Sequence, residues 1–173
     1  MSIWKCALLL STSVLFACSQ QVRTIKHAPN TALAVNNGYL LLSVDSSVNL
    51  EQLNISGKKS IFLGAADLAK GNHYLLVDLP AGEYQIDSVK LSHWWRLQLK
   101  PGYWNFSVHP GQISYIGELQ LKGQAPELEN RASMALQYLE KEHAALLRSY
   151  QVRYSGPGSD HYFEYVAAPG AAK

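Results

Sequence analysis

The sequence predicts a mainly β domain that carries one long helix near its C-terminus, a fold of the α+β class. Short apolar or alternating segments recur between residues 37 and 122 at intervals of about ten residues, which is typical of a sandwich or small barrel. Turn residues separate these segments at 80–82, 101–102 and 110–111. Residues 131–150 then contain neither Gly nor Pro and have apolar side chains at helical spacing. We therefore expect a small β-sandwich, a helix packed on its sheet, and a short C-terminal hairpin.

The individual strands are predicted from the local order of apolar and polar residues. Residues 39–44 form a continuous apolar run, whereas residues 53–56 and 83–86 alternate with the period of two that a strand with one buried face requires. Residues 65–71 are expected to form a loop or a single helical turn. The predicted strands are residues 39–44, 53–56, 60–63, 74–77, 83–91, 93–99, 104–109 and the segment after Gly111.

Residues 93–99 and 104–109 are predicted to pair as an antiparallel hairpin around a loop at residues 100–103. Their apolar side chains must face one core, because a shift by one residue would oppose apolar to polar side chains along the whole pair. This register places Leu99 opposite Trp104 and Trp94 opposite His109. The predicted core set is Trp95, Leu97, Leu99, Trp104, Phe106 and Val108.

The outer face of this predicted hairpin is the candidate binding surface. It consists of Trp94, Arg96, Asn105, Ser107 and His109. An indole ring beside polar groups can stack on a sugar or pack against a peptide side chain, so this set favours a glycan or protein ligand. In the alternative interpretation, Trp94 lies under the C-terminal helix or hairpin and has a structural role.

The C-terminal third of the chain is predicted to be one helix, a hairpin and a tail. Asn130 is a suitable N-cap for a helix over residues 130–150, which docks on the sheet through an apolar stripe. The stripe consists of Leu136, Leu139, Leu146, Leu147 and Tyr150. Residues 151–154 and 162–166 flank a Gly- and Pro-rich turn and are expected to form the final hairpin, and residues 167–173 a flexible tail.

The N-terminus has the pattern of an export signal. Lys5 precedes residues 6–16, which carry no charge and are shorter than the roughly 20 apolar residues that span a bilayer. The segment ends in Leu15-Phe16-Ala17-Cys18, which resembles the lipobox of bacterial lipoproteins, although Phe16 is bulkier than the residue usual in that family. The alternative is an ordinary signal peptide with a chance cysteine, or a buried strand, which the polar residues 19–21 disfavour.

The resemblance to lipoproteins implies a membrane anchor and a cellular location. Residues 1–17 would be removed, and Cys18 would carry acyl chains such as palmitate that hold the protein on a membrane. In this family an aspartate after the cysteine retains the protein in the inner membrane, and Ser19 instead implies the periplasmic face of the outer membrane. We expect residues 18–36 to be a lipidated, flexible tether and residues 37–166 to be a single domain.

The predicted domain has a second resemblance, carried by short turn motifs. Residues 79–86, Leu-Pro-Ala-Gly-Glu-Tyr-Gln-Ile, resemble the central hairpin of carboxypeptidase-regulatory-like and transthyretin-like β-sandwich modules. Residues 108–117 are similar to a strand pair in uncharacterised bacterial lipoproteins with such modules. The resemblance spans about residues 38–122 and implies a binding or scaffolding module without a catalytic residue.

Residue counts and spacing exclude several kinds of chemistry. The only cysteines are Cys6 and Cys18, so the mature chain has no disulfide pair, and its six histidines lack metal-ligand spacing. Residues 159–161, Ser-Asp-His, are adjacent in sequence, and neighbours rarely form a triad. The net charge of +2, or +1 without Lys5, indicates no nucleic-acid partner. We predict neither a cofactor nor a metal.

Two classes of function are compatible with these observations. The favoured class is a non-catalytic lipoprotein of the cell envelope whose sandwich binds a protein or glycan. The alternative is a periplasmic hydrolase that acts on an envelope glycan or peptide. A flat, exposed aromatic patch would favour binding, and a concave pocket with convergent carboxylates or histidines would favour the enzyme.

Overall fold

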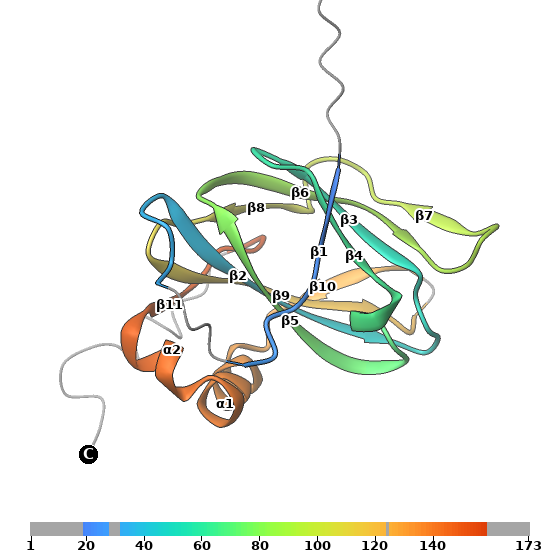
Figure 1. The fold of residues 1–173 in the computed structure, drawn as a ribbon. Coiled ribbons are helices and arrows are strands. Elements are labelled where there is room, and N and C mark those ends of the chain that lie inside the picture. Colours follow the sequence, from blue (N-terminus) through green and yellow to red (C-terminus); the bar gives the residue numbers. More distant parts are fainter. Residues whose placement is uncertain (1–18, 28–31, 124, 159–173) are drawn as a thin grey trace, which may run out of the picture.

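The computed structural model describes residues 19–27, 32–123 and 125–158, which form two β-sheets packed face to face. Figure 1 shows the two sheets as layers, with two short helices on the outer side of one of them. This arrangement confirms a mainly β, sandwich-like fold with a helical region near the C-terminus. The prediction of a single long helix is wrong, because the region contains two short helices.

The first sheet, sheet A, contains β6 as its longest strand. Its order is β1 (Gln20–Val22), β4 (Ile61–Gly64), β3 (Gln52–Gly57) and β6 (Gly82–Lys90), followed on the far edge of β6 by β7 (Arg96–Gln98) and β8 (Asn105–Val108). Only the pairing of β1 with β4 is parallel. The 3-10 turn η1 (Ala65–Asp67) follows β4, within the segment predicted to be a loop or a helical turn.

The second sheet, sheet B, is built around β2 and β9. Its order is β10 (Glu127–Glu129), β9 (Gln112–Leu121), β2 (Asn37–Ser46) and β5 (Gly71–Pro80), and β11 (Gln151–Tyr154) pairs in parallel with β9. The predicted partner of β11, residues 162–166, and the tail at 167–173 lie outside the described residues.

Sheet B buries apolar side chains on both of its faces. In β2, Leu40 and Leu42 point into the core between the sheets, while Tyr39 and Leu41 point to the outer face that the helices cover. The run at residues 39–44 is continuously apolar for this reason. Sheet A buries only one of its faces, since β3 and β6 alternate between buried apolar and partly exposed polar residues.

A β-bulge lets β9 serve both of these cores. Tyr115 pairs with Leu41 but Glu118 pairs with Ser43, so β9 has one more residue than β2 at this point. Gly117 adopts a φ of +119°, and a Cβ atom there would lie 2.9 Å from the Glu129 carbonyl oxygen. The bulge changes the phase of the strand, so that Leu119 faces the inner core although Tyr115 faces the helices.

The helical region consists of α1 (Ala132–Glu142) and α2 (Ala144–Ser149) and not of one helix over residues 130–150. The break is at His143, whose φ of −137° and ψ of 39° lie outside the helical region. The predicted docking on the sheet is confirmed, because Leu139 and Leu146 pack with residues of the outer face of sheet B. The amide nitrogen of Ala132 donates to Asn130 Oδ1 at 3.1 Å, although the helix itself starts after Arg131.

The segment after Cys18 is part of the sandwich, contrary to the predicted tether. Gln20–Val22 form β1, and the Gln20 amide donates to the Ser60 carbonyl oxygen at 2.9 Å. The chain then crosses to sheet B, where the Ile25 amide donates to the Leu76 carbonyl oxygen at 2.8 Å and the Leu76 amide donates to Thr24 Oγ1 at 2.9 Å. One short segment therefore joins the edges of both sheets, as the blue strand in Figure 1 shows.

The buried His143 makes the stability of the domain depend on pH. Its Nε2 lies 3.0 Å from the Tyr138 hydroxyl, and its Nδ1 has no partner among the described residues. Burial lowers the pKa of the imidazole most strongly, the nearby Glu142 raises the pKa, and His27 lowers it. The pKa of His143 in the folded state lies below the unfolded value of about 6.5, so the neutral imidazole favours the folded state. This contribution to the free energy of unfolding is complete above about pH 6.5 and is lost as the pH falls from there through the folded pKa. We predict a lower free energy of unfolding near pH 5.5 than near pH 7.5.

Urea unfolding at both pH values measures this effect, with His143→Gln as the comparison. The variant should keep only the pH dependence of other groups, among them His109. An equal pH dependence of wild type and variant would contradict the assignment.

Candidate functional site

The predicted hairpin of residues 93–99 with 104–109 is not formed. Strands β7 and β8 both pair with β6: Leu97 lies opposite Val89, and Phe106 lies opposite Tyr84. The two strands therefore follow each other along the same edge of β6, and residues 100–103 loop out between them. Backbone hydrogen bonds to β6 continue on both sides of this loop. The Leu99 amide donates to the Asp87 carbonyl oxygen at 2.8 Å, and the Ile86 amide donates to the Trp104 carbonyl oxygen at 3.1 Å.

This arrangement separates the five predicted binding residues into two groups. Arg96 lies opposite Lys90, whereas Ser107 lies opposite Glu83, seven positions away on β6. At about 3.3 Å per residue these positions are about 23 Å apart. Trp94 and Arg96 therefore belong to one end of the sheet edge, and Asn105, Ser107 and His109 belong to the other.

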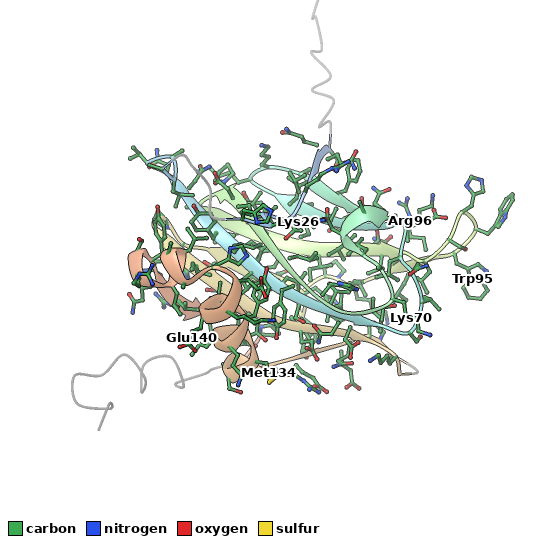
Figure 2. All side chains as sticks on the ribbon, turned by 60° about the horizontal axis from the view of Figure 1, so that its bottom comes forward. Lys26, Lys70, Trp95, Arg96, Met134 and Glu140 are labelled. Carbon is green, nitrogen blue, oxygen red and sulfur yellow. The ribbon has the colours of Figure 1, made fainter. Side chains whose placement is uncertain are left out.

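The first group forms an exposed aromatic tip, defined here as His93, Trp94, Trp95 and Arg96. Trp94 is 87% exposed and Trp95 is 73% exposed. In Figure 2 the labelled Trp95 lies at the far end of the molecule and points away from the sandwich. The rings of His93 and Trp94 meet edge to face with centroids 4.8 Å apart.

The prediction that Trp95 lies in the core is wrong, and the end of the strand ladder explains why. Pairing with β6 stops at Arg96 and Lys90, so Trp95 belongs to the connection and not to the pleated strand. Within the connection the Leu91 amide donates to the Trp95 carbonyl oxygen at 2.8 Å, and the Trp95 amide donates to the Ser92 carbonyl oxygen at 3.2 Å. These bonds turn the chain tightly enough that both indole rings project outward.

In the second group, Asn105 and Ser107 lie on the outer face of sheet A. Trp104, Phe106 and Val108 are buried in the core, so Asn105 and Ser107 face outward. Ser107 Oγ donates to Glu83 Oε1 at 2.7 Å. Asn105 lines a shallow hollow of about 320 Å³, together with Ser56, Gly57, Glu83, Tyr84 and Gln85.

The rest of the outer face of sheet A is polar and internally hydrogen-bonded. Asn54 Nδ2 donates to Ser88 Oγ at 3.0 Å, and Ser56 Oγ donates to Asp87 Oδ1 at 2.8 Å. Side chains linked in this way lose little further freedom when they bind a ligand. At the end near the aromatic tip, Lys90 pairs with Glu51 at 2.8 Å.

His109 lies apart from Trp94, which the prediction had placed opposite it. Its amide donates to Ser114 Oγ at 2.9 Å, which ties the start of β9 to the end of β8. Burial lowers the pKa of its imidazole, Arg153 lowers it further, and Glu83 raises it. At neutral pH His109 is therefore an uncharged group at the edge of the polar face.

A second polar cluster, on the outer face of sheet B, was not predicted. Glu118 is 2% exposed and accepts hydrogen bonds from Ser43, Asn72 and Gln120, and it pairs with Arg131 Nε at 3.0 Å. The bulge at Gly117 turns Glu118 to this face. A prediction that assumes strict alternation of the two faces along a strand places Glu118 on the opposite face. These contacts connect Glu118 to β2, to β5 and to Arg131, which directly precedes α1.

A hollow of about 430 Å³ lies between β5, α1 and the N-terminal segment. Its ionisable lining groups include Asp67, His73, Glu142 and Lys26. His73 Nε2 contacts the Lys70 carbonyl oxygen at 3.2 Å, and Asp67 Oδ2 accepts from the Thr24 amide at 3.4 Å. Asp67 Oδ1 is buried and has no partner among the described residues.

The part of the chain that the structure describes contains neither a cluster of metal ligands nor a membrane-spanning helix. In that part of the chain, no group of three or more His, Cys, Asp or Glu side chains converges as a metal site would require. Nor does it contain a helix long and apolar enough to span a membrane. The lipidation site Cys18 and the Ser-Asp-His sequence at 159–161 lie outside the described residues.

Comparison with known proteins gives no relative. No protein family, no curated protein and no solved structure matches the chain. The two resemblances of the sequence, to lipoproteins and to carboxypeptidase-regulatory-like modules, therefore stay predictions.

The corrected positions of the tryptophans predict opposite effects of their removal. Trp104→Ala should lower the free energy of unfolding by about 3–5 kcal/mol, because it empties a buried site. Trp95→Ala should change it by less than about 0.5 kcal/mol, because Trp95 is 73% exposed and removing its ring leaves no buried cavity. Urea unfolding of both variants measures the difference, and a large loss for Trp95→Ala would show that this ring is buried in solution.

Proposed function

We propose that the chain is a lipid-anchored, non-catalytic binding module of the bacterial cell envelope, held at the periplasmic face of the outer membrane. Its anchor is Cys18, and its ligand is an envelope protein or glycan. The signal-like residues 1–17 and the sequence Leu15-Phe16-Ala17-Cys18 support the anchor. The aromatic tip and the polar outer face of sheet A support the binding role.

The observation that carries the binding role is the joint exposure of Trp94 and Trp95 at one turn. Large aromatic side chains that fold a domain are buried, as Trp104 is. Two adjacent indole rings in water are unfavourable unless another molecule covers them. Trp and Arg are also the residue types that most often dominate the energy of binding interfaces, and Arg96 is exposed beside the two rings.

The anchor is tested by metabolic labelling with palmitate. The wild-type chain should incorporate the label and lose residues 1–17, because the thiol of Cys18 is the acceptor. Cys18→Ala should remain an unlabelled precursor, whereas Cys6→Ala, in the segment to be removed, should be labelled normally. Equal incorporation into Cys18→Ala would show that the anchor is elsewhere or absent.

The binding role is tested by a binding isotherm of the purified chain on isolated cell-envelope fragments. Trp94→Ala should weaken binding by about thirtyfold, since a tryptophan at the centre of an interface contributes about 2 kcal/mol or more. Met134→Ala is the matched control, because Met134 is 49% exposed but lies on α1, far from the aromatic tip in Figure 2. Equal affinities of the two variants would contradict the proposal.

A periplasmic hydrolase is the second candidate, favoured by the hollow lined by Asp67, His73 and Glu142. Asp67 would supply a carboxylate with one oxygen not committed to the fold. Release of soluble products from envelope glycan or peptide by the wild type, and its loss in Asp67→Asn, would establish this candidate.

A further inference from the structure

The start of β1 limits how far the domain can lie from its anchor. Ser19 is the only residue between Cys18 and Gln20, and the Gln20 amide is bonded to the Ser60 carbonyl oxygen at 2.9 Å. Two chain steps reach at most about 7 Å. If Cys18 is acylated, as the proposed function holds, the turn at residues 57–60 lies at the level of the lipid headgroups.

Two further turns are tied to the turn at residues 57–60. Lys58 Nζ donates to the Ala81 carbonyl oxygen at 3.1 Å, which connects it to the turn between β5 and β6. The Ala81 amide donates to the Asn36 carbonyl oxygen at 2.8 Å, which connects that turn to the one before β2. The turns at residues 34–37, 57–60 and 80–82 therefore form one continuous surface, called here the basal surface.

The side chains of the basal surface suit an anionic lipid interface. Val35 is 93% exposed at the tip of the turn that the Asn37 amide closes onto the Ala34 carbonyl oxygen at 2.9 Å. Lys58 is exposed, Lys59 is partly exposed, and none of the three turns contains an acidic residue. An apolar tip beside ammonium groups matches the acyl boundary and the phosphates of a bilayer surface.

We propose that the basal surface lies on the headgroups of the membrane that holds the anchor, with Val35 at the acyl boundary and Lys58 and Lys59 against lipid phosphates. The aromatic tip then points away from this membrane. Gly82 of the basal surface starts β6, and Lys90, beside the tip, ends it about 26 Å farther along. Figure 1 shows the β6–β7 connection at the opposite end of the molecule from the start of β2.

The test uses the full acylated chain in phosphatidylcholine vesicles with phosphatidylglycerol. Cys6 is removed with the signal and Cys18 is blocked by acylation, so a new cysteine is the only free thiol. Val35→Cys, Lys58→Cys and His93→Cys are each labelled with a fluorophore and exposed to a quencher on the lipid headgroup. Labels at positions 35 and 58 should be quenched several-fold more than the label at position 93.

The outcomes separate this inference from the proposed function. Intact mass first establishes acylation, and an acylated chain whose labels at 35 and 58 are not quenched overturns the basal surface while the anchor stands. Stronger quenching at 93 also overturns it, because the aromatic tip would then be the membrane contact. A chain without acyl groups refutes both the anchor and the inference built on it.

The charge of the basal surface is tested separately. Lys58→Glu combined with Lys59→Glu should reduce quenching of the label at Val35→Cys when phosphatidylglycerol is present. Lys70→Glu combined with Lys100→Glu is the matched control, since it changes the charge by the same amount at two exposed lysines outside the three turns. Equal effects of the two changes would overturn the role assigned to the lysines.

Discussion

Burial of both faces of sheet B is the constraint on which the rest of the structure depends. The inner face packs against sheet A, and the outer face needs α1 and α2 to cover Tyr39, Leu41 and Tyr115. Burial at about 25 cal/mol per Å² of apolar surface drives both contacts. Because the helices cover sheet B, the outer face of sheet A is left open to solvent. The polar side chains of β3, β6 and β8 on that face are compatible with this exposure.

The two ends of sheet A differ in structure. Its strands are tied together at the basal surface by bonds between turns, and Gly57 and Gly82 have positive φ angles there. At the other end of β6 the chain makes a tight connection that packs only Leu91 against the core. A rigid base and a projecting tip are the geometry expected of a module that is anchored at one end and binds at the other.

Local sequence patterns predicted much of the fold, and the errors concern contacts between residues far apart in the sequence. Phe106 and Val108 were placed correctly, because alternation holds wherever a strand stays in its ladder. Trp95 was misplaced because the ladder ends at Arg96, which depends on the length of β6. The pairing of β7 and β8 was wrong because local patterns do not identify the partner strand, and here both strands pair with β6 instead of with each other. The break at His143 and the strand at Gln20–Val22 likewise depend on contacts with distant residues.

In the proposed function, a partner occupies the aromatic tip in the intact envelope. Hydroxyl-radical footprinting of whole envelopes, compared with the purified chain in detergent, tests it most directly. We expect oxidation of Trp94 and Trp95 to be strongly reduced in envelopes, while oxidation of the exposed Met134 stays the same in both samples. Equal oxidation of the two tryptophans in envelopes and in detergent would contradict the account.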